Sequence, residues 1–310
     1  MNPFVSAVLA GDRRALARLI TQIENNQIEA RAALATLYPQ TGKAHLLGVT
    51  GAPGTGKSTL VNELARAYRR TQRTVAIVAV DPTSPFTGGA ILGDRIRMRD
   101  LAGDAGVFIR SMATRGSLGG LARATGEVVT ALDAAGFDTI LIETVGAGQS
   151  EVDIAQLAHT TLVVEAPGLG DDVQAIKAGI LEIADILVVN KADQPGTESA
   201  VRALRGMMAL AHPEPGAREV PICETVATES KGVIELMAAI ESHRAYLQQS
   251  DHLSEKIRQR ASRQIELILR EVLYHRFITA DGQPAKIESA IAAVVNRAQD
   301  PYSAALELLP

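Results

Sequence analysis

The sequence contains no tryptophan, and only 3% of its 310 residues are aromatic. Proteins bind single-stranded nucleic acids by stacking the bases on exposed aromatic rings, so this shortage argues against that class of ligand. The formal net charge of −4 also argues against general binding to nucleic acids or to anionic membranes. Cys223 is the single cysteine, which excludes an intrachain disulfide and fits a reducing compartment.

Signals for a membrane, for secretion or for zinc are also missing. No uninterrupted apolar run is long enough to span a bilayer. The N-terminal residues lack the basic-then-apolar layout of a secretory signal, and Asp12, Glu24 and Glu29 count against a transit peptide. The six histidines show no metal-ligand spacing, so a zinc site is not expected. We therefore expect a cytoplasmic protein that binds neither membrane nor nucleic acid.

The strongest local pattern in the chain is a phosphate-binding loop. Residues 51–58 read Gly-Ala-Pro-Gly-Thr-Gly-Lys-Ser, with an apolar run before them at 45–50 and helical spacing after them at 59–68. Glycines in such a loop let successive backbone N–H groups surround an anion at the positive end of a helix. Lys57 then reaches the β- and γ-phosphates, and the Ser58 hydroxyl becomes a ligand of Mg²⁺. The predicted nucleotide contacts are Gly51, Pro53, Gly54, Thr55, Gly56, Lys57, Ser58 and Thr59.

From residue 44 onward, apolar runs alternate with helical stretches. The runs are nearly continuous rather than alternating with polar residues, which predicts strands that are buried on both faces of a mostly parallel sheet. Ligands of such sheets bind at the carboxyl ends of the strands, where polar or glycine-rich residues follow each run. We predict strands at 45–50, 74–80, 137–142, 160–164, 186–189 and 220–223.

Three regions follow from this pattern. Residues 1–43 are predicted to form an N-terminal helical extension, residues 44–242 the nucleotide domain, and residues 243–310 a C-terminal helical region. The last region has an apolar helical face that ends near Phe277, which suggests self-association. The predicted fold class is an α/β P-loop NTPase with a mostly parallel central sheet flanked by helices, plus the two helical additions.

Three carboxylates are candidate ligands of Mg²⁺ together with Ser58. Asp81 and Glu143 each follow an apolar run, and Asp94 lies in a polar segment that contains glycine. Magnesium is usually held by one or two carboxylates together with phosphate oxygens. Each carboxylate taken alone is equally compatible with a solvated charge or a helix cap. Gly146 has the right place for a backbone N–H contact to the γ-phosphate, which would distinguish GTP from GDP.

The residues Asn190-Lys191-Ala192-Asp193 follow another apolar run and favour guanine as the base. The Asp193 carboxylate can accept hydrogen bonds from the N1–H and the 2-amino group of guanine, whereas adenine offers no donor there. Asn190 is expected to brace the loop, and the stem of Lys191 to lie over the base. The backbone N–H of Ala227 is expected to reach the guanine oxygen.

Together these motifs resemble the MeaB/ArgK-type GTPases, which are chaperones of adenosylcobalamin-dependent methylmalonyl-CoA mutase. The resemblance covers most of the chain. It implies a homodimeric GTPase that binds Mg²⁺ with GTP or GDP, associates with the mutase, and gates the loading and protection of cobalamin. It rests on the phosphate loop at 51–59, Asp-Pro-Thr-Ser-Pro at 81–85, Gly-Gly-Ala-Ile-Leu-Gly-Asp-Arg-Ile-Arg-Met at 88–98, Arg-Gly-Ser-Leu-Gly-Gly at 115–120, Glu-Thr-Val-Gly-Ala-Gly-Gln-Ser-Glu at 143–151, and Asn-Lys-Ala-Asp at 190–193.

The resemblance also assigns three switch segments, at 86–99, 143–150 and 168–177, the last of which contains Asp171 and Lys177. Without the resemblance, Asp171 would be interpreted as part of a helix cap and Lys177 as a surface lysine.

Ras-like GTPases carry a glutamine directly after the switch glycine, where it positions the attacking water. Here Ala147 follows Gly146, so we expect slow hydrolysis by the isolated protein. A partner is expected to bring Lys177 and Asp171 to the phosphates. The candidate catalytic residues are Lys57, Asp94, Glu143, Lys177 and Asp171.

Other functions remain open at this stage. A GTPase that delivers nickel to hydrogenase or urease would carry a segment rich in histidine or cysteine, and the sequence has none. An ATP-dependent kinase or transport ATPase would not need the pattern at 190–193. A nucleotide-regulated binding module, in which hydrolysis is incidental, is also compatible with the motifs. Among acyl-CoA mutases, the motifs fit an isobutyryl- or ethylmalonyl-type partner as well.

Overall fold

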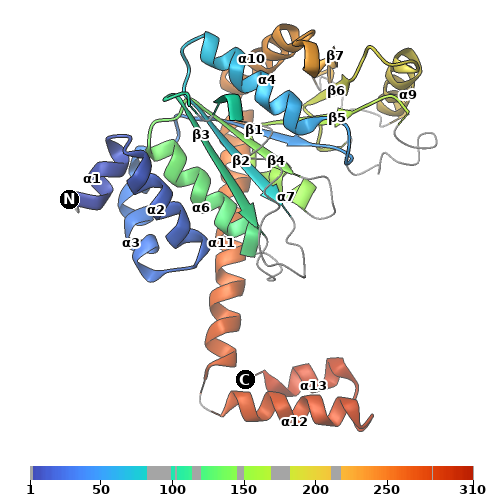
Figure 1. Ribbon diagram of the computed structural model, residues 1–310. Helices are drawn as coiled ribbons and strands as arrows, with labels where there is room; N and C mark the ends of the chain where they lie inside the picture. Colours follow the sequence, from blue (N-terminus) through green and yellow to red (C-terminus); the bar gives the residue numbers. More distant parts are fainter. Residues whose placement is uncertain are drawn as a thin grey trace. The chain divides into compact units, whose positions relative to one another are not determined.

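The computed structural model describes residues 3–81, 99–101, 103–113, 120–144, 150–168, 182–210, 218–280 and 282–309. The chain divides into two compact units, Met1–Arg260 and Ala261–Pro310, and each is described by itself (Figure 1). Asp94, Gly146, Asp171 and Lys177 lie outside the described residues.

The first unit is built on a parallel sheet, as the continuous apolar runs predict. Its described residues form seven strands in the order β3-β2-β4-β1-β5-β6-β7, and every pair of neighbours is parallel. β1 lies between β4 and β5, so the loop that follows β1 opens at the centre of the sheet's carboxyl edge. The strands are β1 (His45–Thr50), β2 (Val75–Asp81), β3 (Val107–Ala113), β4 (Thr139–Thr144), β5 (Thr160–Glu165), β6 (Ile186–Asn190) and β7 (Ile222–Thr225).

The edge strand β3 is the one strand that the sequence analysis did not predict. Arg110 and Ser111 interrupt its apolar run, so the run does not resemble a buried strand. The Arg110 Nε donates to Glu24 Oε1 at 3.0 Å, and Glu24 lies in the N-terminal helix α2 (Arg13–Glu24). This ion pair allows an arginine within an edge strand.

Helices cover both faces of the sheet (Figure 1). The described residues form three hydrophobic clusters. The first contains the N-terminal helices and residues of β1 to β4, the second contains residues of α4 and α10 against β1, β5 and β6, and the third contains residues of α9 against β5 and β6. The N-terminal residues thus pack on the nucleotide domain. The helices of the first cluster are α1 (Pro3–Leu9), α2, α3 (Ile28–Leu37), α6 (Gly120–Ala134) and α7 (Ser150–Leu157). The helices of the other two clusters are α4 (Lys57–Arg70), α9 (Thr197–Leu210) and α10 (Val233–Gln249). Short 3₁₀ turns lie at Tyr38–Gln40, Arg99–Leu101 and Ala227–Glu229.

The division between the units differs from the boundary predicted between residues 242 and 243. That boundary falls within α10, and Leu236, Ile240 and Leu247 of this helix are all buried in the first unit. Because α10 packs in the first unit on both sides of the predicted boundary, the two units do not separate there. The structure places the division after Arg260, inside α11 (His252–Ile278).

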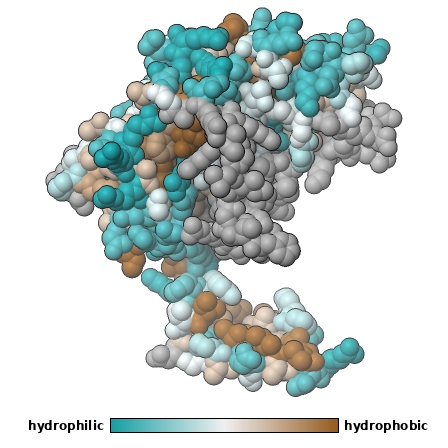
Figure 2. Space-filling model, viewed as in Figure 1, coloured by the Kyte–Doolittle hydropathy of each residue, from teal (hydrophilic) through white to brown (hydrophobic). Residues whose placement is uncertain are grey.

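The second unit contains the rest of α11, α12 (Gln283–Val295) and α13 (Pro301–Leu308). The Asp300 carboxylate caps α13 by accepting from the N–H groups of Tyr302 and Ser303, each at 3.0 Å. Large apolar side chains are exposed on this unit, and Figure 2 shows brown patches on it among teal and pale residues. They are Ile265, Ile268, Leu269, Leu273, Tyr274, Ile291, Val295, Tyr302, Leu306 and Leu309.

In the part of the chain that the structure describes, no helix is both long and apolar enough to cross a membrane. The same part holds no group of three or more His, Cys, Asp or Glu side chains placed to bind a metal.

Candidate functional site: a guanine nucleotide pocket

The loop between β1 and α4 has the backbone that a phosphate cradle needs. Gly51, Gly54 and Gly56 all have positive φ angles, of 135°, 85° and 90°. A Cβ added to Gly51 would lie 2.0 Å from the Val164 carbonyl oxygen, and one added to Gly56 would lie 2.4 Å from the side chain of Asn190. Both positions therefore require glycine for space as well as for conformation. Gly56 is the residue before α4, so the helix N-terminus faces the loop.

Lys57 is positioned inside this loop. It is the first residue of α4 and is 5% exposed. Its Nζ donates to the carbonyl oxygens of Gly51 at 2.8 Å and Ala52 at 2.9 Å. The ammonium group thus lies on the concave side of the loop, where an anion in the cradle would meet it.

The Ser58 side chain contacts the carboxyl end of β4. Its hydroxyl donates to Glu143 Oε1 at 2.5 Å, and Glu143 is 4% exposed. A second contact of 3.1 Å joins the hydroxyls of Thr144 and Thr50 at the ends of β4 and β1. Hydroxyl and carboxylate oxygens are the ligand types that Mg²⁺ prefers, and these two lie in direct contact at the carboxyl edge of the sheet. The donor set therefore fits a magnesium ion.

Asp81 ends β2, whose Val80 is in register with Thr144 of β4. Its backbone therefore lies at the same edge of the sheet as Glu143. Asp94, the other predicted carboxylate ligand, and Gly146, the predicted contact of the γ-phosphate, lie outside the described residues, and so do Asp171 and Lys177.

Asn190 ties together the loops that follow three strands. Its side-chain Nδ2 donates to the Thr55 carbonyl oxygen at 2.8 Å. Its Oδ1 accepts from the Thr225 hydroxyl and from the Ala227 N–H, both at 3.1 Å. Asn190 is 2% exposed, so these bonds are protected from water. They connect the phosphate loop after β1 to the segment after β7.

Two predicted base contacts flank this brace. Lys191 has a left-handed backbone with φ of 58°, and Asp193 is exposed in the turn before α9. The N–H of Ala227, predicted to reach the guanine oxygen, donates to Asn190 in the structure. The sequence analysis missed the contribution of Thr225. Thr225 precedes Ala227 by two residues, but without the strand order nothing relates it to Asn190.

The sequence matches a protein family described as "Methylmalonyl Co-A mutase-associated GTPase MeaB" over residues 16–282. This match spans more than half of the chain and includes every element of the nucleotide pocket. The chain belongs to the MeaB family.

Individual proteins agree with this membership. The MeaB-family chain is 48% identical over 307 residues to a putative GTPase of Pyrococcus horikoshii, which covers 98% of this chain and 96% of that protein. A mitochondrial protein of Caenorhabditis elegans named as a methylmalonic aciduria type A homolog is 37% identical over 202 residues, or 60% of this chain and 51% of that protein. The solved structure of a LAO/AO transport system kinase matches with a TM-score of 0.73 and 26% identity, covering 98% of this chain and 95% of that one. Because the matched family and the Pyrococcus horikoshii relative are both described as GTPases, the MeaB-family chain is a GTPase.

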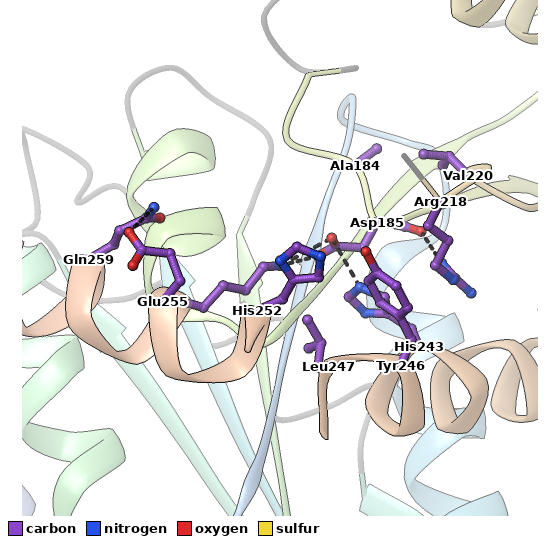
Figure 3. Close-up of a pocket in the computed structure, with 11 residues that line it drawn as sticks. Ala184, Asp185, Arg218, Val220, His243, Tyr246, Leu247, His252, Glu255 and Gln259 are labelled. Carbon is purple, nitrogen blue, oxygen red and sulfur yellow. Dashed lines mark hydrogen bonds and ion pairs between the residues drawn. The ribbon is translucent and has the colours of Figure 1, made fainter. Parts of the chain in front are cut away.

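The opposite edge of the sheet in this MeaB-family chain carries a cluster of buried polar groups. Thr160, at the start of β5, places its hydroxyl 3.0 Å from His45 Nε2 and 2.9 Å from His243 Nδ1. The carboxylate of Asp185 lies 3.3 Å from His243 Nε2 and 2.9 Å from the Lys256 ammonium. Figure 3 shows the Asp185 and His243 side chains of this cluster where they line a cavity. The volume of the cavity is about 330 Å³. The cavity is lined by Ala184, Asp185, Arg218, Val220, His243, Tyr246, Leu247, His252, Glu255, Lys256 and Gln259.

This cluster predicts that the MeaB-family chain loses stability in mild acid. Burial lowers the pKa of His243 from 6.5 to about 4, and it does the same for His159, whose ring stacks on that of His45. In that range the unfolded chain binds more protons than the folded one, so stability falls as the pH drops from 6.5 towards 4. Each such histidine lowers the free energy of unfolding by about 1.4 kcal/mol for every pH unit of this fall. Urea unfolding followed by circular dichroism at pH 7, 6 and 5 measures the slope, which His243→Gln should reduce. A variant as acid-sensitive as the wild type would contradict the assignment.

Proposed function

We propose that this MeaB-family GTPase acts on an adenosylcobalamin-dependent acyl-CoA mutase, with methylmalonyl-CoA mutase as the favoured partner. In this proposal the GTPase gates the loading of the cofactor and protects it, and it works in the cytoplasm. The observation that carries the proposal is the family match over residues 16–282, whose description names the mutase. The relative named for methylmalonic aciduria type A supports the same partner. The single cysteine of the sequence supports a reducing compartment.

We further propose how the pocket divides the work on GTP. The cradle at 51–59 holds the phosphates, and the Lys57 ammonium meets the charge that develops on them during hydrolysis. Mg²⁺, held by Ser58, Asp81, Asp94 and Glu143, would neutralise phosphate charge when bound. The contact between Ser58 and Glu143 supports this ligand set.

The base would lie against Lys191, with Asp193 accepting from its N1–H and 2-amino group. Ala227 would share its N–H between Asn190 and the guanine oxygen. The bonds that Asn190 makes to Thr55 and Ala227 support this arrangement, because they hold the base side and the phosphate side in fixed relation.

The mutase is expected to accelerate hydrolysis. In the proposed mechanism, Lys177 and Asp171 reach the phosphates only when the partner is bound. Supplying a missing charge of this kind raises the hydrolysis rate on the order of 10³- to 10⁵-fold in comparable systems. GTP turnover is measured with and without purified methylmalonyl-CoA mutase, with serum albumin at the same concentration as the control. Equal rates with mutase and with albumin would reject the proposal.

A pull-down of the mutase with GDP and with a non-hydrolysable GTP analogue tests the gating. Mutase binding that is the same with both nucleotides would contradict it.

The homodimer is a separate proposal that rests on the second unit. Ile265, Leu269 and Leu273 follow one another at four-residue spacing on α11, and they are 59%, 53% and 61% exposed. A continuous apolar stripe of this kind marks an interaction surface, and the occupant we propose is a second copy of this chain. Leu269→Glu should place a buried charge in that interface and give monomers in sedimentation velocity, while Glu266→Gln on the same helix stays dimeric. A monomeric wild type would contradict the proposal.

A further inference from the structure

The segment that follows β7 is a closed loop of residues 226–231. The Val226 N–H donates to the Lys231 carbonyl at 3.1 Å, and the Lys231 N–H donates back to Val226 at 3.3 Å. Inside this loop lies the short 3₁₀ turn Ala227–Glu229, and Ser230 ends it in a left-handed conformation with φ of 55°. These two bonds close the loop on itself, so the position of the loop determines where the Ala227 N–H points.

A carboxylate on the phosphate-loop helix holds this loop from outside. The Ser230 hydroxyl donates to Glu63 Oε2 at 2.6 Å, and Glu63 lies within α4 with only 11% of its side chain exposed. Arg66 lies 3.5 Å from the other carboxylate oxygen of Glu63, and it also pairs with Asp100 at 2.6 Å. A hydroxyl that donates to an ionised carboxylate at this distance makes one of the stronger hydrogen bonds in proteins.

The same helix thus contacts both ends of the nucleotide pocket. It begins with Lys57 and Ser58 at the phosphate side and reaches the base side through Glu63. The loop has a second attachment on its inner side, where the Ala227 N–H donates to Asn190. Two attachments, one on each side, fix the loop more narrowly than the Asn190 brace alone.

We propose that Glu63 is a positioning residue for guanine recognition. Through Ser230 it holds the 226–231 loop so that the Ala227 N–H faces the 6-oxo group of the base. The inference rests on the proposed contact between Ala227 and guanine. It adds a residue that no nucleotide motif contains, since in sequence Glu63 resembles a charged residue in the middle of a helix.

The test compares ligands that differ at one base position. GDP, 6-thio-GDP and IDP are titrated into the full-length wild type, Ser230→Ala and Glu63→Ala. The 6-thio ligand replaces the 6-oxo group with a poorer acceptor and keeps the N1–H and the 2-amino group, whereas IDP keeps the 6-oxo group and lacks the 2-amino group. Ser250→Ala is the matched control. The Ser250 hydroxyl donates to the Tyr246 carbonyl oxygen at 2.7 Å, and this bond lies outside the nucleotide pocket.

We expect the two pocket variants to bind GDP on the order of 10-fold more weakly, the effect of losing a hydrogen bond to a charged group. Their preference for GDP over 6-thio-GDP should shrink, while their preference for GDP over IDP, which Asp193 determines, stays at the wild-type value. The double variant should bind no more weakly than either single variant, because both remove the same bond.

Two results would overturn the inference: unchanged affinities, or an equal loss for all three ligands, which indicates a general structural role. Thermal unfolding of each variant is measured first, and Glu63→Gln replaces Glu63→Ala if the latter does not fold. A wild type that fails to prefer GDP over both analogues would instead reject the proposed guanine contacts.

Discussion

Replacing Asp193 with asparagine is expected to change the preferred nucleotide from GTP to XTP. The carboxylate accepts two hydrogen bonds from guanine, whereas an amide presents a donor to one of those two positions. Hydrogen bonds to charged groups contribute about 1.5 to 3 kcal/mol each, so GTP should bind on the order of 10²-fold more weakly or worse. Xanthine carries an oxygen in place of the 2-amino group and can accept from the new amide. Binding and hydrolysis are measured with GTP, XTP and ATP.

A nearby charge provides the matched control for this substitution. Glu229 pairs with Lys231 at 2.6 Å, and Lys231 also interacts with the charge of Asp193. Glu229→Gln therefore removes one negative charge at the same edge of the pocket without changing the group that contacts the base. It should keep the preference for GTP. If the wild type binds ATP as well as GTP, or if Asp193→Asn keeps its preference for GTP, guanine recognition by Asp193 is wrong and an ATP-dependent activity becomes the better interpretation.

The sheet could be predicted where burial on both faces produces a continuous apolar run. β1 and β4 are buried along their full lengths, and β1 begins and ends where the sequence places it. The order of the strands is a different matter, because no local pattern states that β4 lies between β1 and β2. The edge strand β3 was missed because Arg110 is balanced by Glu24 from a helix far away in the sequence.

The candidate site shows the same division. Lys57, Ser58 and Asn190 belong to short patterns whose chemistry can be interpreted from residue types and spacing. Their contacts depend on the fold, since Ser58 meets Glu143 and Asn190 meets Thr55 only after the sheet brings distant loops together. Contacts outside any motif, such as that between Glu63 and Ser230, cannot be inferred from sequence alone.

Lys57→Met is expected to reduce GTP hydrolysis on the order of 10²- to 10³-fold, the effect of removing one preorganised donor from a developing negative charge. Methionine keeps most of the length of the side chain and lacks the ammonium group. The structure supports so large an effect because Lys57 is buried and its Nζ is already fixed by the carbonyl oxygens of Gly51 and Ala52. The ammonium group of Lys57 then needs to move little to contact the phosphates. Single-turnover hydrolysis at saturating GTP measures the rate, and titration with GDP measures the accompanying loss of affinity.

Lys43→Met is the matched control for this prediction. Lys43 is exposed and lies just before β1, at the end of the strand opposite the phosphate loop. Its replacement changes the net charge by the same amount and should leave the rate at the wild-type value. Because methionine leaves two loop carbonyls without the Lys57 donor, thermal unfolding of both variants must also be compared. A folded Lys57→Met that hydrolyses GTP within tenfold of the wild-type rate would show that the phosphate charge is met by another group, and the proposed division of work in the pocket would be wrong.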